Sequence, residues 1–464
     1  MNQNIKKLGI LIICLLAVLV FYLSYLNVVK GPVLAVNPHN RRLQEYESQI
    51  RRGTIYDSNG IVLAATDFSG EKNKRVYPRG RETAHLLGYI SERYGRDGLE
   101  SACDRYLLGL EGADRTRNYI NKLLGREQLG GDITLTIDSD LQGLALNMLA
   151  GRRGAVVLLD PETGAVRVLV SNPGYDPNKL GEIWPRLSQD EDAPLLNRAV
   201  QGAYPPGSTF KIVTAAGALA AKPDAARETF NCRGFLEVDG YRLDDTAVHG
   251  RIDIKKAIAV SCNTTFAQLG LDQGAQNFVR TVKAFGIDRD PGIGIPVRPG
   301  SMATPEAFIP TELAASAIGQ GELLVSPLHM ALAAAAIANS GDLMNPYLIE
   351  TVKDSTGQVL RQEEARHWLN VTTPQICGII KDGMVDAVRS GTAAAARVAG
   401  VQVAGKTGSA QNPHGQAHAW FIGFAPAERP RLAVAVLVEN AGSGGTVAAP
   451  IAGQLLSAAL NKGY

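Results

Sequence analysis

Cysteine and aromatic residues are scarce in this chain, and neither sign of charge dominates it. Five cysteines occur among 464 residues, and no two of them form a Cys-x-x-Cys pair. This spacing argues against a zinc ribbon, a thioredoxin-like redox site and a dense disulfide framework. The formal net charge is only +2, so the chain is not a polycation suited to nucleic acid. We therefore expect no metal, no cofactor and no nucleic-acid partner.

One long apolar run stands at the start of the chain. Residues Leu8 to Leu26 carry no charge, and as a helix at about 1.5 Å per residue they would span roughly 28 Å, close to a bilayer core. Lys6 and Lys7 precede the run and favour a cytoplasmic N-terminus with an exported remainder. We predict a cytoplasmic tail over 1–7 and a transmembrane helix over 8–26. A cleavable signal peptide, with a cleavage site at Leu34-Ala35-Val36, is the alternative.

The rest of the chain is too long for one ordinary core. Short strand signals follow the apolar run, with a hairpin turn at Asp57-Ser58-Asn59-Gly60, because Asn-Gly readily adopts the positive φ angles of tight turns. The composition changes near Gly151, where two apolar strands flank the turn Pro161-Glu162-Thr163-Gly164. We predict a small, mostly β domain over 27–150 and a larger domain over 151–464.

The larger domain is predicted to be α+β. Alanine-rich helical segments fill its middle, and strands return at 401–404, 419–424 and 432–438, before a last helix over 451–460. Strands at both ends of a domain with helices between them favour one sheet shared by the first and last strands. We expect this sheet to be mainly antiparallel and packed between helices.

The first candidate motif is a serine followed by a lysine one helical turn later. Ser208 and Lys211 open an apolar helical run, Ile212 to Ala221, and Pro205-Pro206-Gly207 precedes them. A serine hydroxyl needs a neighbouring base, which a lysine supplies if burial lowers its pKa. The helix N-terminus also favours the negative oxygen that develops in acyl transfer. Taken alone, the pair also fits a surface serine beside a solvated lysine.

The second candidate motif is Ser261-Cys262-Asn263, between two helical runs. On a tight turn Ser261 and Asn263 can face one cleft, where the hydroxyl would relay a proton and the amide would hold a substrate carbonyl or a lysine. Helix capping is the alternative for an isolated match. Cys262 would make the site sensitive to thiol reagents, or would serve only in packing.

The third candidate motif is Lys406-Thr407-Gly408-Ser409, expected at the end of an apolar strand. A lysine with two hydroxyls suits a substrate carboxylate, and Gly408 permits the close approach of another backbone segment. Residues 400–407 also satisfy the Walker A pattern, but Val401 to Ala404 alternate like a strand and no helix can start after Gly408.

In this order the three motifs resemble those of penicillin-binding proteins and serine β-lactamases. The resemblance covers almost the whole chain and is closest to class B penicillin-binding proteins, compact and without C-terminal repeat domains. Ser58 departs from it, since the family often has arginine there. The resemblance rests on further segments outside the three motifs: Arg52 to Gly60, Gly98-Leu99-Glu100, Leu135 to Asp138, Leu141-Gln142, Ser171 to Asn178 and Asn197-Arg198-Ala199.

The resemblance implies a membrane-anchored D,D-transpeptidase whose smaller domain is a non-catalytic pedestal. Ser208 would attack the D-Ala-D-Ala carbonyl of a peptidoglycan stem peptide, Lys211 would be the base, and Ser261 would pass a proton to the departing D-alanine. Asn263 would hold the substrate. Lys406 would lower the pKa of its lysine neighbour through like charge and, with Thr407 and Ser409, would bind the substrate carboxylate, with Gly408 in the same substrate-binding segment. The backbone N–H groups of Ser208 and Ser409 would form the oxyanion hole.

The resemblance also implies inhibition by β-lactams, an acceptor amine from a second stem peptide, and a membrane glycosyltransferase as partner. A serine β-lactamase or β-lactam sensor on the same site, and a catalytically idle cell-wall scaffold, remain alternatives. Glu306 lies roughly where a hydrolytic glutamate would stand, and we interpret it as a loop carboxylate. His414 and His418 are four residues apart, but Pro413 and Gly415 oppose the helix that a metal pair would need.

Overall fold

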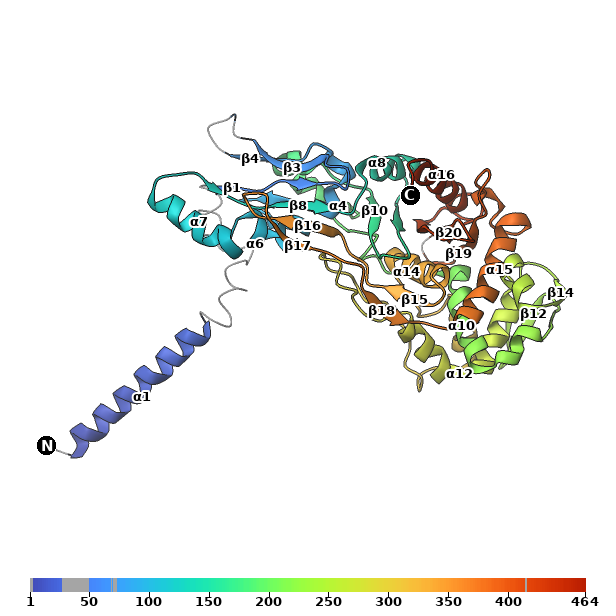
Figure 1. Ribbon diagram of the computed structural model, residues 1–464. Helices are drawn as coiled ribbons and strands as arrows, with labels where there is room; N and C mark the ends of the chain where they lie inside the picture. Colours follow the sequence, from blue (N-terminus) through green and yellow to red (C-terminus); the bar gives the residue numbers. More distant parts are fainter. Residues whose placement is uncertain (1–2, 27–49, 68, 70–72, 414) are drawn as a thin grey trace.

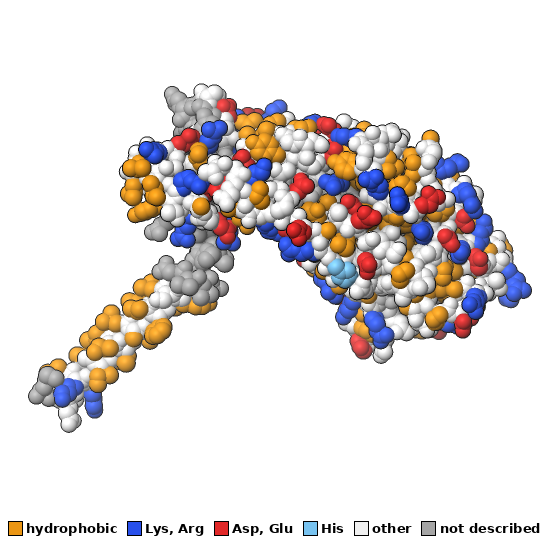
Figure 2. All heavy atoms as spheres, viewed as in Figure 1, with side chains coloured by type: hydrophobic (Ala, Val, Ile, Leu, Met, Phe, Trp, Pro, Cys, Tyr) orange, Lys and Arg blue, Asp and Glu red, His pale blue; other side chains and the backbone are white. Residues whose placement is uncertain are grey.

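A computed structural model describes residues 3–26, 50–67, 69, 73–413 and 415–464 of the chain (Figure 1). The first helix, α1 (Gln3–Tyr25), has a mean hydropathy of 2.7 over its most apolar 18-residue window and buries none of its residues. Figure 2 shows its hydrophobic side chains exposed along its length. Among the described helices it alone is long and apolar enough to cross a membrane, as predicted. The alternative cleavage site at Leu34-Ala35-Val36 lies outside the described residues.

The smaller domain is built on a six-stranded sheet. The predicted turn joins two of its strands, and the Asp57 carboxylate caps this turn by accepting hydrogen bonds from the N–H groups of Asn59 and Ile61, both at 2.8 Å. In sheet order the strands are β17 (Val359–Gln362), β16 (Ile349–Lys353), β8 (Asp132–Leu135), β2 (Ile55–Tyr56), β3 (Val62–Asp67) and β4 (Lys74–Val76).

Two strands of this sheet come from beyond the boundary expected at residue 150. β16 pairs with β8, so that Val352 lies opposite Ile133, and β17 extends the sheet outward from β16. The hydrophobic core is also continuous, because Ile133 and Leu135 belong to the same cluster of buried side chains as residues of the larger domain. The division into domains over 27–150 and 151–464 remains a prediction. The chain enters the smaller domain a second time with β16 and β17, so one boundary at residue 150 does not describe both units.

A buried charge network fixes the segment that opens the smaller domain. Arg52 lies 2.8 Å from the Glu100 carboxylate and 2.7 Å from that of Asp104. Arg75 approaches the other Glu100 oxygen at 2.7 Å, and Arg96 reaches Asp104 at 2.9 Å. All five side chains are almost fully buried. Buried charges need paired partners, and each of these five charges has one.

The larger domain is built on a five-stranded, fully antiparallel sheet, as predicted. Its first and last strands are neighbours, since β9 pairs with β21. One face is covered by α14 (Pro327–Ala338), and the other by α8 (Ser139–Met148) and α16 (Ala448–Asn461). In sheet order the strands are β10 (Val166–Asn172), β9 (Gly154–Leu159), β21 (Leu432–Val438), β20 (His418–Ala425) and β19 (Ala404–Ala410).

A helical region with two small two-stranded sheets lies beyond β19 (Figure 1). Its strands form two-stranded sheets only: β11 (Phe230–Cys232) pairs with β14 (Gly250–Ile252), and β12 (Phe235–Val238) with β13 (Tyr241–Asp244). The other helices of six residues or more are α7 (Gly112–Leu123), α9 (Leu180–Leu187), α10 (Lys211–Ala221), α11 (Ile254–Val260), α12 (Asn263–Ala284), α13 (Pro310–Ala317) and α15 (Pro374–Ser390).

Candidate active site

Ser208 lies on a tight turn that leads directly into α10. The turn is a 3-10 helix, η4 (Gly207–Phe210), and it starts at Gly207 with a φ of 55°, in the left-handed region that glycine tolerates best. The Gly207 N–H donates a hydrogen bond of 2.8 Å to the Gly319 carbonyl, which anchors the turn from outside. Ser208 is half-buried, and within the described chain no hydrogen bond holds its hydroxyl. The turn therefore presents an available hydroxyl at a helix start, as predicted.

Lys211 is the first residue of α10 and is fully buried. Its ammonium nitrogen donates hydrogen bonds to the Ser261 carbonyl oxygen at 2.6 Å and to the Asn263 side-chain oxygen at 2.7 Å. Burial lowers the pKa of Lys211 to about 7, although Asp245 and Cys262 act in the opposite direction. A substantial fraction of this amine is thus neutral near neutral pH, which a general base requires.

The second motif lies on the sharp turn between α11 and α12. Ser261 adopts φ 61° and ψ 41°, a left-handed conformation that is uncommon for a non-glycine residue. Cys262 caps α12, its sulfur accepting a hydrogen bond from the Thr265 N–H at 3.5 Å. This turn brings both Ser261 and Asn263 to Lys211. Helix capping and placement at Lys211 were the two alternatives for this motif. Cys262 caps α12, and its neighbours Ser261 and Asn263 contact Lys211.

Lys406 also approaches Ser261. Its nitrogen lies 2.7 Å from the Ser261 hydroxyl oxygen, and its side chain is completely buried. Burial, followed by the neighbouring charge of Lys211, lowers the pKa of Lys406 well below the ordinary lysine value. Lys406 lies within β19, which runs from Ala404 to Ala410, so the expected strand over 401–404 was placed too early. The alternating apolar residues before Lys406 do not mark the strand, because its pairing with β20 starts only at Ala404.

The remaining residues of the third motif line the open edge of the sheet. Among the described strands β19 pairs with β20 alone, and η4 packs against it. A Cβ atom at Gly408 would lie 3.0 Å from the Pro206 carbonyl oxygen, so a larger residue would push the turn back by a few tenths of an ångström. Thr407 forms a hydroxyl contact of 2.9 Å with Thr392, and the Ser409 hydroxyl accepts a hydrogen bond of 3.3 Å from the Gly444 N–H.

The structure thus brings the side chains of Lys211, Ser261, Asn263 and Lys406 into one hydrogen-bonded group beside the Ser208 turn. A hydroxyl at a helix start, one helical turn before a buried amine whose pKa is lowered to about 7, is suited to nucleophilic acyl transfer, although no hydrogen bond joins the two groups in the described chain. The unpaired side of an edge strand could pair with an extended peptide substrate. The oxyanion role of the Ser208 and Ser409 N–H groups stays a prediction.

The structure does not fit the competing interpretations of a phosphate-binding loop, a hydrolytic glutamate or a helical histidine pair. Residues 404–410 form a strand instead of a phosphate-binding loop, and β19 ends at Ala410 without leading into a helix. Glu306 is exposed in a loop. His418 lies on β20, where its Nδ1 atom accepts a hydrogen bond from the Asn440 N–H, and His414 lies outside the described residues.

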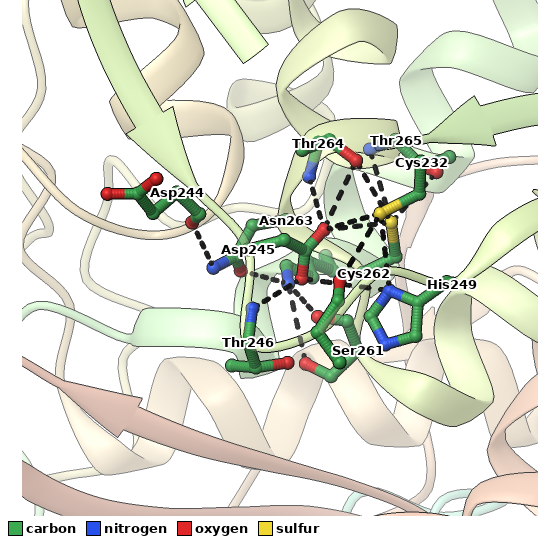
Figure 3. A network of polar contacts seen from close by, with 12 residues as sticks. Cys232, Asp244, Asp245, Thr246, His249, Ser261, Cys262, Asn263, Thr264 and Thr265 are labelled. Atoms are coloured by element: carbon green, nitrogen blue, oxygen red, sulfur yellow. Dashed lines mark hydrogen bonds and ion pairs between the residues drawn. The ribbon is translucent and has the colours of Figure 1, made fainter. Parts of the chain in front are cut away.

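A group of potential metal ligands includes Cys262 of the second motif (Figure 3). It consists of Cys232, Asp245, His249 and Cys262, which we call the thiol cluster, and their ligand atoms all lie within 4.8 Å of one another. Sequence reasoning missed this group, because Cys262 stands 17 residues from Asp245 and no Cys-x-x-Cys pair marks it. Asp245 and His249, four residues apart, were the only local signal.

Two family profiles match the chain. The penicillin binding protein transpeptidase domain matches residues 154–457, and the penicillin binding protein A dimerisation domain matches residues 52–133. Two similar proteins carry the name peptidoglycan D,D-transpeptidase. PbpA of Mycolicibacterium smegmatis is 34% identical, with 100% of both chains covered. MrdA of Acinetobacter baumannii is 31% identical over 81% of this chain and 64% of its own.

Solved structures agree with these sequence matches. Penicillin-binding protein A from M. tuberculosis, as its ceftriaxone acyl-enzyme complex, superposes with a TM-score of 0.84 at 33% identity, covering 90% of this chain and 100% of its own. The penicillin G acyl-enzyme complex of that protein gives a TM-score of 0.82 at 34% identity, with 89% and 100% covered. In both structures, that relative forms an acyl-enzyme with a β-lactam.

Proposed function

This chain belongs to the penicillin-binding protein transpeptidase family, and we propose that within it Ser208 is the residue that carries the acyl group. The chain is a peptidoglycan D,D-transpeptidase that acts by serine acyl transfer and is acylated by β-lactams. The observation that carries the residue assignment is the convergence of Lys211, Ser261 and Lys406 beside the Ser208 turn.

Acylation begins when the Ser208 oxygen attacks the carbonyl carbon of the penultimate D-alanine of a stem peptide. Lys211, as the neutral amine, accepts the hydroxyl proton. The oxygen that becomes negative is stabilised by the N–H groups of Ser208 and Ser409, aided by the positive end of the helix. The carbon–nitrogen bond then breaks, and the terminal D-alanine leaves after its nitrogen takes up a proton that passes through Ser261.

Lys406 and its strand orient the donor peptide. Lys406 holds the Ser261 hydroxyl at 2.7 Å, which aims the proton relay. Thr407, Gly408 and Ser409 lie on the sheet edge beside the turn, where two hydroxyls suit the terminal carboxylate of the substrate. Asn263 keeps Lys211 in place through the 2.7 Å hydrogen bond and has an amide to offer the substrate. The acyl-enzyme is resolved by the amine of a second stem peptide, which forms the cross-link.

Labelling with a fluorescent penicillin tests the assignment of Ser208. The wild-type chain should carry the label through denaturing electrophoresis, and Ser208→Ala should carry none. Ser409→Ala is the informative companion, because it keeps the backbone N–H and should lower the labelling rate without abolishing it. Stable labelling of Ser208→Ala would reject the assignment. Nitrocefin hydrolysis measured in parallel separates this function from a β-lactamase, since rapid turnover would favour the hydrolase.

We also propose that α1 anchors the chain with its N-terminus in the cytoplasm and both larger units outside, with Lys6 and Lys7 as the supporting charges. A membrane glycosyltransferase is the proposed partner. The support is an apolar patch on α7: Tyr119 is 65% exposed and Leu123 is 70% exposed. Figure 2 shows hydrophobic side chains gathered at the end of the smaller domain where Figure 1 draws α7. Exposed patches of this kind mark interaction sites.

Co-purification from membranes tests the partner proposal. Leu123→Glu on α7 should reduce recovery of a glycosyltransferase with the chain, while penicillin labelling stays unchanged. Val248→Glu, also at a highly exposed apolar residue but in the larger domain, is the matched control. Equal recovery with both variants would reject α7 as the contact.

A further inference from the structure

The chain that leads into the Ser208 turn depends on outside partners to hold its shape. Pro205 and Pro206 have no backbone N–H, so neither can donate the hydrogen bond that a strand or a helix would use. The Pro206 carbonyl accepts a hydrogen bond of 2.6 Å from the Thr209 hydroxyl within the turn itself. The Pro205 carbonyl is left to a partner from another part of the fold.

Trp420 is the partner of that carbonyl. This tryptophan lies on β20 and is completely buried, and its indole Nε1–H donates a hydrogen bond of 3.0 Å to the Pro205 carbonyl oxygen. Its backbone lies opposite Gly408 in the pairing of β20 with β19. Paired residues of neighbouring strands project from the same face of a sheet, so Trp420 reaches from the strand pair of the third motif to the chain before Ser208. One rigid side chain thus joins the two elements that meet at Ser208.

Tyr204 fixes the same chain one residue earlier. It is 8% exposed, and its ring meets the Trp420 ring edge-on with 6.4 Å between the two centroids. Its hydroxyl donates a hydrogen bond of 2.7 Å to the Glu439 carboxylate. Burial and the Glu439 charge raise the pKa of Tyr204, so the phenol keeps its proton and remains the donor. The backbone of Tyr204 also pairs with Val325, through hydrogen bonds of 3.0 and 2.9 Å.

Glu439 gives the tyrosine a fixed point of attachment. It follows β21 directly, and its side chain is only 12% exposed. The carboxylate oxygen that accepts from Tyr204 also lies 2.7 Å from the Arg198 Nε atom, and the other oxygen lies 3.2 Å from the Arg153 Nε atom. Two guanidinium groups match this largely buried charge, so the carboxylate is stable where it stands. The anchorage of Tyr204 therefore lies outside the three motifs.

We propose that Tyr204, Trp420 and Glu439, which we call the Ser208 clamp, are positioning residues that set the distance between the Ser208 turn and β19. The inference rests on the roles proposed for Ser208 and Ser409. Their N–H groups would form the oxyanion hole, and one of these groups belongs to the turn while the other belongs to the strand. Such donors act only at short, well-defined distances from the oxygen, so the spacing of the two elements decides how well they act together.

The turn and the strand are packed closely. A Cβ atom at Gly207 would lie 3.2 Å from Ala410, and one at Gly408 would lie 3.0 Å from the Pro206 carbonyl oxygen, so a larger residue at either position would push the two elements apart. No side chain of these glycines separates the turn from the strand, and Trp420 holds their spacing from the neighbouring strand instead. The clamp acts through the turn and not on the substrate. Its loss should therefore slow the chemical step and leave substrate binding unchanged.

Saturation kinetics of acylation test the clamp. The whole chain in detergent is mixed with increasing concentrations of a chromogenic cephalosporin, which yields the dissociation constant of the non-covalent complex and the acylation rate at saturation. Trp420→Phe removes the indole N–H, and Tyr204→Phe removes the hydroxyl. We expect the saturated rate to fall by about 10²-fold in Trp420→Phe and by about tenfold in Tyr204→Phe, while the dissociation constant changes by less than about twofold.

Two control variants remove the same groups at sites away from the turn. Tyr175→Phe deletes the hydroxyl of a buried tyrosine that donates a hydrogen bond to the Ala84 carbonyl. Trp368→Phe replaces a half-buried tryptophan on β18 (His367–Asn370). Both variants should be acylated at the wild-type rate.

The amount of fluorescent penicillin bound at completion separates positioning from misfolding. A folded variant with a displaced turn reaches the wild-type stoichiometry slowly, whereas a partly misfolded one stops at a lower stoichiometry. Should Trp420→Phe stop low, Tyr204→Phe decides the question. A wild-type saturated rate in either folded variant would overturn the role of that residue, and a loss confined to the dissociation constant would overturn the clamp. Stable labelling of Ser208→Ala would instead reject the acyl carrier, so the two failures are distinguishable.

Discussion

Lys406 and Ser261 meet at 2.7 Å between the side-chain nitrogen and the hydroxyl oxygen, although 145 residues separate them in the chain. Ser261 also lies 3.4 Å from the Lys211 nitrogen, so one hydroxyl stands between two buried lysines. Two ammonium groups this close and this deeply buried disfavour each other's charge. The pair therefore favours a state in which at least one lysine is neutral, which suits the role of base that we propose for Lys211.

The acylation rate should depend on pH through Lys211. Its pKa is lowered to about 7, and the base is the neutral amine, so the rate should rise as the pH increases through this value and level off above it. Stopped-flow acylation of the wild-type chain, followed at several pH values with a chromogenic cephalosporin, measures the profile. Lys211→Met should lose the rising limb together with most of the rate. A wild-type rate that stays flat across this range would contradict Lys211 as the base.

Removing the Ser261 hydroxyl should affect peptide substrates and β-lactams to different degrees. Ser261→Ala deletes the group between the lysines, and we expect the rate of acyl transfer to fall by about 10²-fold or more. Because Ser261 serves the departing amine, peptide substrates should be affected more strongly than β-lactams, whose leaving nitrogen stays tethered. Equal losses for both substrate types would argue that Ser261 acts only by positioning the lysines.

Gly319 should also matter for acylation, although it lies outside the three motifs. A Cβ atom there would lie 2.0 Å from the Gly207 carbonyl oxygen, and the φ of Gly319 is +80°, so alanine must displace the turn that carries Ser208. We expect Gly319→Ala to lower the acylation rate by about 10²-fold, as geometric misplacement of reacting groups does. Kinetics of fluorescent-penicillin labelling provide the measurement.

The matched control for that variant is Gly378→Ala. Gly378 lies inside α15, its Cβ atom would contact nothing within 4 Å, and its backbone is helical. Alanine there should leave labelling unchanged and stabilise the chain by roughly 0.5 to 1 kcal/mol. If both glycine variants lost acylation equally, the effect could not be assigned to the Ser208 turn.

Breaking the buried charge network should destabilise the smaller domain. Glu100→Ala leaves Arg52 and Arg75 without their shared carboxylate, at a cost of about 3 to 5 kcal/mol in the free energy of unfolding. Thermal unfolding followed by circular dichroism measures the loss. Removal of the exposed Arg105–Glu111 pair by Glu111→Ala should cost less than about 1 kcal/mol. Similar effects of both variants would remove burial as the explanation.

The same network makes stability depend on pH. Burial raises the pKa of Glu100, but Arg75 and Arg52 outweigh it and hold the pKa below its ordinary value. The stabilisation is therefore fully present above the pKa of an unfolded glutamate, about 4.3, and is lost as the pH falls below it. Denaturant unfolding near pH 7 and near pH 4 should show a smaller acid-induced loss in Glu100→Gln than in the wild-type chain.

Local sequence signals were enough to identify the chemistry. The apolar run predicted the anchor, and the strands at both ends of the larger domain predicted the sheet packed between helices. The three motifs in their order predicted the family. A helix start, a turn and a strand each follow from neighbouring residues, so the sequence alone predicted that Ser208 and Lys211 share one helical turn. The limits of the strand around Lys406 could not be predicted in this way, because they depend on pairing with β20.

Which distant residues share a location follows only from the packing of the folded chain. Lys406 and Ser261 come into contact because β19 and the α11–α12 turn pack beside α10, and the strands β16 and β17 complete a sheet that starts more than two hundred residues earlier. The thiol cluster is the clearest case. Nothing in the spacing of Cys232 and Cys262 predicts a shared site, because a metal ligand set is defined by distances in space and those distances arise only when separate segments fold against one another.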